Sequence, residues 1–183
     1  MLTRIGLLSD VHASAGPVRE ALAIFAREGV QQILCPGDIA GYGEEVDECV
    51  RLLQESGAQV VVGNHDRWYV ERGEGDDETL GYLDGLPSAL NLNIAGRQLY
   101  LVHASPAESD MDGIRLLDET GEPIPEALAH WRLRLEGFGH DALVVGHTHQ
   151  VFAERLGETL VINPGSTVFN HSCAILRLPE LEV

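Results

Sequence analysis

The sequence predicts an α/β fold in which two sheets pack together, with antiparallel strands added to a parallel core. In the first half, short apolar runs alternate with amphipathic stretches, at residues 5–9, 18–28, 32–35, 44–55 and 60–62. That alternation indicates βαβ units with parallel strands. In the second half, paired apolar runs flank glycine-containing turns, which is typical of antiparallel hairpins.

Turn residues separate the elements of the first half. Gly16-Pro17 opens the helix expected over residues 18–28, where apolar residues recur at helical spacing. Pro36-Gly37 ends the second strand, and Gly63 ends the third. The helix expected over residues 44–55 connects these two strands.

The second half contains two expected hairpins, one further helix and two further strands. Ala95-Gly96-Arg97 marks the first hairpin turn, and Gly157-Glu158 marks the second. Segments 68–83 and 106–125 give no periodic signal, and we expect both to be loops. The predicted elements are strands at 90–94, 98–103, 142–146, 151–156, 159–162 and 173–178, and a helix at 126–135.

Length and composition narrow the class of protein. A chain of 183 residues fits one domain, residues 1–183, and has no apolar run long enough to span a membrane. All twelve basic residues are arginines and the net charge is −17, so extended contact with nucleic acid is not expected. Three irregularly spaced cysteines and the lack of a secretory signal pattern predict free thiols and a cytoplasmic location.

Metal-capable side chains follow five of the predicted strands. They are Asp10 and His12, then Asp38, then Asn64, His65 and Asp66, then His103, and finally His147 and His149. Because parallel strands end at the same edge of a sheet, we expect these side chains to meet there. Each motif alone also fits a turn, a helix cap or a surface histidine. Their repetition at strand ends favours a metal site.

The motifs Asp10-x-His12, Gly37-Asp38, Gly63-Asn64-His65-Asp66, His103 and Gly146-His147-Thr148-His149 together resemble the calcineurin-like metallophosphoesterase superfamily. The short length and the stretch from Gly37 to Gly43 are similar to its small prokaryotic phosphodiesterase branch. The resemblance implies a four-layer α-β-β-α sandwich of two mixed sheets. It also implies one metal held by Asp10, His12, Asp38 and His149, and a second held by Asp38, Asn64, His103 and His147.

The same resemblance implies a phosphodiesterase or phosphatase that hydrolyses small phosphate esters. A hydroxide bridging two divalent ions would attack in line with the leaving group. His65 would assist as the substrate-facing histidine, paired with Asp66, and Asn64 would also contact substrate. Oxygen and imidazole ligands suit transition metals. We expect Mn²⁺, while Fe²⁺, Zn²⁺ and Ni²⁺ fit the same ligand set.

Several residues keep two interpretations. Arg67 is a candidate for binding the substrate phosphate, but an exposed ion pair is the commoner outcome. Asp66 is either catalytic or a helix cap. Trp68 lines the substrate entrance or covers the core. The acidic segment 106–125 is a candidate lid.

Other functions fit the same motifs. One alternative is a dinucleoside-polyphosphate hydrolase or a protein phosphatase, and another is a non-catalytic scaffold of the same fold. The lack of a basic groove favours a small phosphate ester or nucleotide as substrate. Metals and His65 address only the phosphoryl group, so the leaving-group pocket has to come from the flanking loops.

Overall fold

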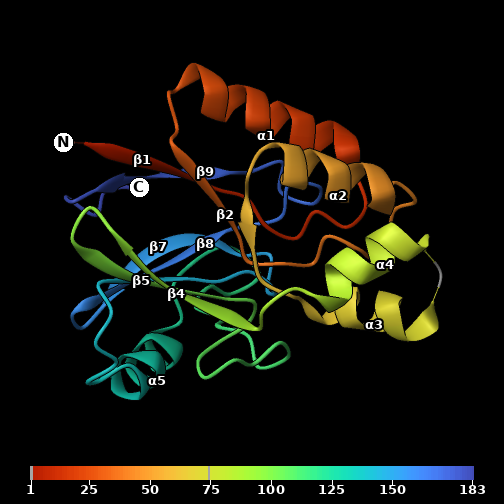
Figure 1. Ribbon diagram of the computed structural model, residues 1–183. Coiled ribbons are helices and arrows are strands. Elements are labelled where there is room, and N and C mark those ends of the chain that lie inside the picture. Colours follow the sequence, from red (N-terminus) through yellow and green to blue (C-terminus); the bar gives the residue numbers. More distant parts are fainter. Residues whose placement is uncertain (1, 74) are drawn as a thin grey trace.

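The computed structural model describes residues 2–73 and 75–183, which form two mixed β-sheets and five α-helices (Figure 1). The helices are α1 (Ala15–Arg27), α2 (Val46–Glu55), α3 (Asn64–Arg72), α4 (Asp77–Asp84) and α5 (Pro125–Arg134). The strands are β1 (Thr3–Leu7), β2 (Gln32–Cys35), β3 (Gln59–Val60), β4 (Ala89–Ile94), β5 (Arg97–Val102), β6 (Ala142–Val144), β7 (Val151–Leu156), β8 (Thr159–Pro164) and β9 (Ala174–Leu178).

Each sheet combines three parallel strands with one or two antiparallel edge strands. The first has the order β3-β2-β1-β9, in which the first three strands are parallel and β9 is antiparallel. The second has the order β4-β5-β6-β8-β7, in which the central three strands are parallel and both edge strands are antiparallel. The predicted βαβ units and both hairpins are confirmed.

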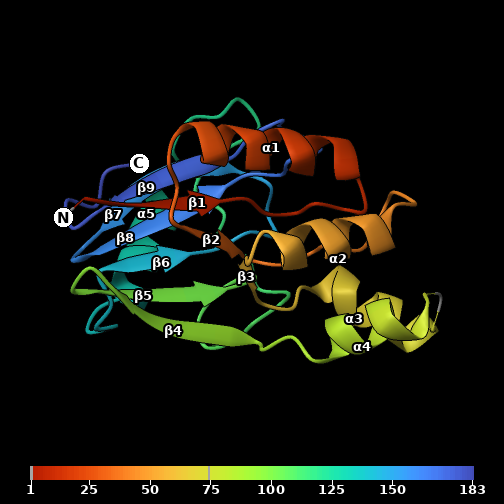
Figure 2. The same ribbon diagram turned by 45° about the horizontal axis from the view of Figure 1, so that its top comes forward.

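The two sheets pack face to face, and helices cover their outer faces (Figures 1 and 2). Along β1, Ile5 and Leu7 enter the core between the sheets, whereas Leu8 packs beneath α1 and α2. On β6, Val144 faces the first sheet and Leu143 faces the α5 side. Strands buried on both faces explain why these runs are continuously apolar. The predicted four-layer sandwich is confirmed.

Segment 68–83 is not the loop that the sequence predicted. It contains most of α3 and nearly all of α4, which pack on each other at the edge of the first sheet. In contrast, residues 106–124 are irregular apart from isolated bridges, as expected. Among the described residues, none of the helices has both the length and the apolar character needed to span a bilayer.

The six parallel strands of the two sheets end at the same edge of the sandwich, on the right of Figure 1. The predicted metal ligands follow β1, β2, β3, β5 and β6 there. The fold therefore brings side chains from five separate segments to the C-terminal edge of both sheets.

Candidate metal centre

The seven predicted ligands converge at this edge. Their potential ligand atoms form three groups, each with all atoms within 4.8 Å of one another. The groups are Asp10, His12 and His149; His12, Asp38 and His65; and Asp38, His103 and His147. Asn64, which carries no carboxylate or imidazole, lies against the third group. Six of the seven predicted ligands are members of a group, His65 is the one further member, and Asp38 and His12 each belong to two groups.

The first group joins the end of β1 to the end of β6. Nε2 of His12 lies 3.0 Å from Nε2 of His149, and Nε2 of His149 lies 3.3 Å from Oδ1 of Asp10. Asp10 is fully buried, and its carboxylate accepts the backbone N–H of His147. The loops of the two sheets are thus locked together at this point.

The third group surrounds the side-chain oxygen of Asn64. Oδ1 of Asn64 lies 3.0 Å from Nε2 of His103 and 3.0 Å from Nδ1 of His147. Oδ2 of Asp38 lies 3.4 Å from Nε2 of His103. All four residues predicted to hold the second ion are therefore adjacent.

Backbone carbonyls set the tautomers of two of these histidines. Nδ1 of His12 lies 3.2 Å from the carbonyl oxygen of Ala40, and Nδ1 of His103 lies 2.8 Å from that of Pro36. A carbonyl only accepts, so in each neutral ring Nδ1 carries the proton and Nε2 presents a lone pair to the cluster. Lone pairs, carboxylates and an amide oxygen converging on one region suit a divalent cation, and imidazole with oxygen donors suits a transition metal.

The protonation of the cluster follows from burial and charge. For His103, burial opposes protonation, but the hydrogen bond and charge of Asp38 outweigh it and raise the pKa to about 9. For Asp38, burial raises the pKa, but the hydrogen bond and charge of His103 outweigh burial and hold the pKa below its usual value. Burial lowers the pKa of His12 and of His147. In the metal-free chain, Asp38 and His103 thus form an ion pair.

At two positions glycine is required because neighbouring side chains approach its backbone closely, and not because of its dihedral angles. A Cβ on Gly63 would overlap the carboxylate of Asp38, and one on Gly146 would lie 2.6 Å from Oδ2 of Asp10. Neither glycine has a positive φ, whereas Gly37 does, with φ 101°. Both motifs, Gly-Asn-His-Asp and Gly-His-Thr-His, therefore begin with glycine because residues that follow another strand occupy the space of a side chain: the carboxylate of Asp38 at Gly63, and the hydroxyl of Ser9 with the carboxylate of Asp10 at Gly146.

Backbone strain gathers at the same place. Five of the predicted ligands have a left-handed φ, between 46° and 65°: Asp10, His12, Asp38, His147 and His149. Such a conformation costs about 1–3 kcal/mol for a residue with a side chain, and it clusters at functional sites in proteins. The strain aims these side chains into the cluster.

Asp66 is placed differently from the prediction that it orients His65. Its carboxylate is fully buried and accepts the backbone N–H groups of Asp38 (3.0 Å), Ala40 (2.8 Å) and Gly63 (2.9 Å). Burial and the charge of Asp38 raise its pKa to about 7, against the opposing effect of these donors. Among the described contacts, none joins this carboxylate to His65. It caps α3 and fixes the loop that carries Asp38.

Arg67 forms an ion pair instead of reaching into the cluster. Its Nε lies 2.7 Å from Oδ2 of Asp110, and its Nη2 lies 3.0 Å from Oγ of Ser88. The arginine side chain is 44% exposed. This is the ion-pair alternative of the sequence analysis, and it joins α3 to the 106–125 segment.

His65 lies at the open side of the centre. Its backbone N–H donates to Oδ1 of Asp38, and its ring centroid is 5.0 Å from that of His12. The His65 ring also contacts the rings of Trp68 and Tyr42, each at a centroid distance of 4.9 Å, and the residue is half-buried. His65 is therefore beside the metal cluster and accessible from solvent.

The end of β8 and the segment after it support the site. Oγ of Ser166 donates to the carbonyl of Asp10 (2.7 Å), and Nδ2 of Asn163 donates to the carbonyl of Gly146 (2.9 Å). The same segment carries Phe169, whose ring stacks on His149 at 5.1 Å. Sequence reasoning gave Phe169 no role, since one apolar residue in an irregular segment has no periodic signal.

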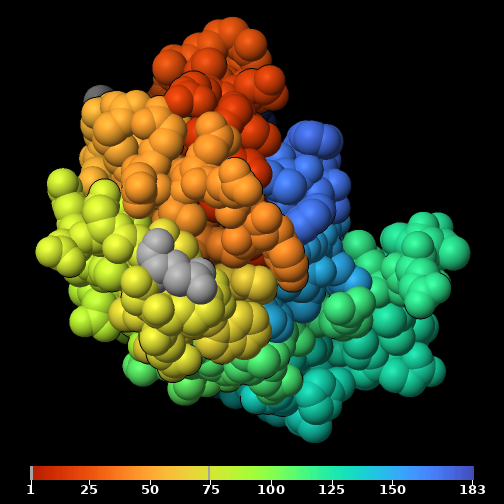
Figure 3. All heavy atoms as spheres, turned by 90° about the vertical axis from the view of Figure 1, so that its right-hand side faces the viewer, coloured from red at the N-terminus to blue at the C-terminus, as the bar shows by residue number. Residues whose placement is uncertain are grey.

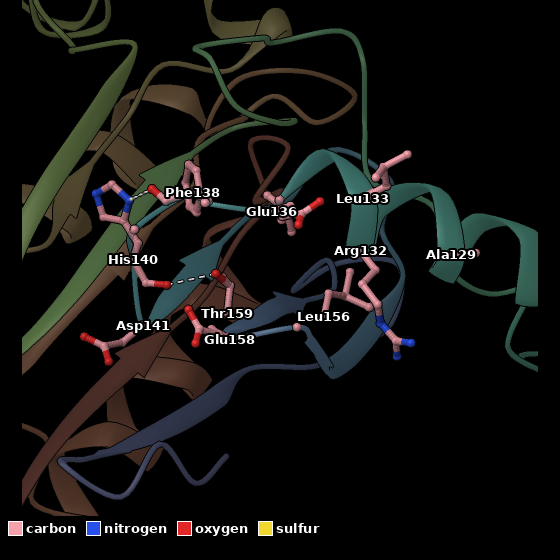
Figure 4. Close-up of a pocket in the computed structure, with 14 residues that line it drawn as sticks. Ala129, Arg132, Leu133, Glu136, Phe138, His140, Asp141, Leu156, Glu158 and Thr159 are labelled. Atoms are coloured by element: carbon pink, nitrogen blue, oxygen red, sulfur yellow. Dashed lines mark hydrogen bonds between the residues drawn. The ribbon is translucent and has the colours of Figure 1, made fainter.

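A second hollow lies at the opposite end of the second sheet, with a volume of about 1100 Å³ (Figure 4). It is lined by residues before β6, in the β7–β8 turn and on α5. Its histidine, His140, has both ring nitrogens engaged, by the carbonyl of Phe138 and by Oδ1 of Asn91. The lining contains none of the three metal-capable groups, which lie at the opposite end of the sheet.

Similarity to known proteins agrees with this geometry. The calcineurin-like phosphoesterase superfamily domain matches residues 3–178. Uncharacterized protein MJ0912 of Methanocaldococcus jannaschii is 26% identical over 179 residues, which cover 88% of this chain and 68% of that protein. A metallophosphoesterase from Sphaerobacter thermophilus superposes with a TM-score of 0.69 at 24% identity, covering 90% of this chain and 76% of that one. An archaeal phosphodiesterase superposes with a TM-score of 0.64 at 19% identity, covering 98% and 96%. The chain belongs to the calcineurin-like phosphoesterase superfamily.

Proposed function

We propose that this chain is a dinuclear-metal phosphoesterase that hydrolyses small phosphate esters, with a phosphodiester or a phosphomonoester as substrate. The observation that supports it most directly is the sharing of Asp38 between two of the metal-capable groups. A carboxylate has two oxygens and one negative charge, so it can bridge two cations and offset their repulsion. That bridging position is what a two-metal site requires.

Two divalent ions, with Mn²⁺ as the ion we expect to support activity, would neutralise the phosphate charge and acidify a water. The first would be held by Asp10, His12, Asp38 and His149, and the second by Asp38, Asn64, His103 and His147. This donor set fits both ions, since each member presents an oxygen or an imidazole nitrogen to the cluster.

The protein's own groups account for substrate orientation and proton transfer. His65 is the partly exposed imidazole beside the cluster, so it is placed to contact a phosphoryl oxygen and to protonate the departing alkoxide. Asn64 lies between His103 and His147 and would present its amide to substrate as well as to metal. Asp66 acts as a positioning residue through the backbone of Asp38 and Gly63.

The test measures metal content and activity on the same samples. The chain is stripped with a chelator and reloaded with Mn²⁺, its metal content is determined by elemental analysis, and hydrolysis of bis(p-nitrophenyl) phosphate and p-nitrophenyl phosphate is followed. We expect two ions per chain and activity on at least one ester. In Asp38→Ala we expect fewer than two ions and loss of activity, because both ions lose a shared ligand.

Glu119→Gln is the matched control, since Glu119 is an exposed acid in the 106–125 segment. It should keep both the metal content and the rate. Fewer than one ion per chain in the wild-type protein, with no hydrolysis, would favour the scaffold alternative over the enzyme. Activity that survives in Asp38→Ala would overturn the proposed site.

A further inference from the structure

Exposed aromatic side chains gather at the metal centre. The large aromatic residues that stand clearly exposed among residues 2–73 and 75–183 are Tyr42 (69%), Phe169 (51%) and Trp68 (39%). They come from the loop after β2, the segment after β8 and helix α3. Three distant segments thus bring their exposed rings to one place, the edge where the ligands meet.

The rings form one continuous row. Trp68 lies 4.9 Å from His65, His65 lies 4.9 Å from Tyr42, Tyr42 lies 5.5 Å from Phe169, and Phe169 lies 5.1 Å from His149. We call Tyr42, Trp68 and Phe169 the aromatic row. Figure 3 faces this end of the molecule, where the loop after β2 (orange) lies between α3 (yellow) and the segment after β8 (blue).

The exposure of the row is a cost that folding alone does not explain. Burial of apolar surface stabilises a fold by about 25 cal/mol per Å², and an exposed ring forgoes that stabilisation. The other large aromatic side chains of the chain are mostly buried, with Phe25 and Trp131 at 1% and 5% exposure. Exposed rings that meet beside metal-capable residues resemble the aromatic platforms on which planar groups stack.

We propose that the aromatic row is a subsite for a planar aromatic ring in the leaving group of the phosphate ester. This rests on the proposed function, since it places the phosphoryl group at the metal cluster. His65 links the two parts: its ring lies in a metal-capable group with His12 and Asp38, and it also contacts Trp68 and Tyr42. A ring attached to a phosphate at the cluster would reach the row.

Charge selects a small ligand over a polymer. The net charge of −17 opposes binding of a long polyanion, and Arg67, the arginine nearest the row in sequence, is paired with Asp110. The row therefore supplies stacking without an extended positive surface. The ligand is one aryl or nucleobase ring joined to one phosphoryl group, and the experiment distinguishes these two sources.

The test uses phosphonates, whose carbon–phosphorus bond is not hydrolysed. Binding of phenylphosphonate and methylphosphonate to the Mn²⁺-loaded chain is measured by calorimetry and by Trp68 fluorescence in a Trp131→Phe background. We expect phenylphosphonate to bind about tenfold more tightly, the order of one stacked ring. In the Tyr42→Leu/Phe169→Leu variant, we expect this ratio to fall to about one, with methylphosphonate affinity unchanged.

Tyr42→Phe is the matched control, because it keeps the ring and removes only the hydroxyl; it should keep the ratio. The non-hydrolysable phosphonate analogues of adenosine 5′-monophosphate and of ribose 5-phosphate, in which a methylene replaces the ester oxygen, give the second pair. A larger ratio than for the phenyl pair indicates a nucleobase, and an equal one indicates an aryl group. A ratio of one in the wild-type chain, or one that survives in the double variant, overturns the subsite.

The outcome separates this subsite from the proposed activity. Ring-dependent phosphonate binding without hydrolysis of any ester would support the row and contradict the phosphoesterase. Hydrolysis of phosphate esters, with no ring preference in phosphonate binding, would support the phosphoesterase and contradict the row. A double variant that loses metal while keeping the binding ratio would show that the rings only shield the ligands from solvent.

Discussion

Replacing Asp66 by asparagine tests whether this residue acts on chemistry or on structure. The two side chains have nearly the same shape, but the carboxylate has two acceptor oxygens and the amide has one. Oδ1 accepts from Ala40, and Oδ2 accepts from both Asp38 and Gly63. In Asp66→Asn, the amide group must turn an N–H₂ toward at least one of these backbone donors.

The least costly arrangement leaves the amide oxygen on Asp38 and Gly63. The N–H of Ala40 then loses its acceptor in a fully buried position. An unsatisfied buried donor costs about 1–3 kcal/mol. For a chain of this length, each kcal/mol lowers the Tm by about 2–4 °C, so we expect the Tm to fall by roughly 2–12 °C.

Thermal unfolding and steady-state kinetics on the same preparation distinguish the two roles. We expect a lower Tm together with weaker Mn²⁺ binding, since the loop that carries Asp38 loses its support. Asp84→Asn, on the exposed surface of α4, is the matched control and should change stability by less than about 0.5 kcal/mol.

A different result would indicate that Asp66 takes part in catalysis. If it orients His65 for proton transfer, Asp66→Asn should lower kcat strongly, leave Tm and metal content unchanged, and have no further effect in a His65→Ala background. That pattern would refute the positioning role deduced from the three backbone hydrogen bonds.

Three further predictions follow from the geometry of the centre. Because the pKa of His103 is about 9, the ring must lose a proton before Nε2 binds metal, so Mn²⁺ affinity should rise from pH 7 to about 9. Calorimetry in two buffers of different ionisation enthalpy should show about one proton released at pH 7. An affinity that does not depend on pH would contradict this prediction. Gly63→Ala should abolish metal binding, because the added Cβ would overlap the carboxylate of Asp38, whereas Gly16→Ala, where a Cβ meets nothing within 4 Å, should bind two ions by elemental analysis. Arg67→Ala removes an exposed ion pair with Asp110 and an exposed hydrogen bond to Ser88, so the free energy of unfolding in urea should change by less than about 1 kcal/mol with KM unchanged. A large rise in KM would show that this arginine turns to the substrate.

The parallel strands and the ligands at their ends could be predicted because both follow from local pattern. Strands buried on two faces are continuously apolar, and the first polar residue after each one marks its C-terminal end. Asp10, Asp38 and His103 stand at such positions, and the structure brings them together. No pattern in the chain specified which carboxylate lies against which histidine, because that depends on how the two sheets pack.

The remaining features depend on tertiary contacts. Helix α3 begins inside the Gly-Asn-His-Asp motif, and its partly buried residues Tyr69 and Val70 pack on the core beneath α1 and α2. The helix is stabilised by that packing. The packing could not be predicted from a nine-residue segment that is rich in polar residues. Phe169 was missed for the same reason: its contact with Tyr42 joins segments 127 positions apart along the chain.

Two of the three metal-capable groups draw on both halves of the sandwich. Asp10 and His12 follow a strand of the first sheet and His149 follows a strand of the second; likewise Asp38 belongs to the first sheet, and His103 and His147 to the second. A cation bound to either group would therefore cross-link the sheets at their common edge, where otherwise only side-chain packing and loop hydrogen bonds hold them. Loss of the ions should first loosen the contact between the two sheets at this edge. Hydrogen exchange should then become faster in the loops after β1 and β6, while the strands stay protected.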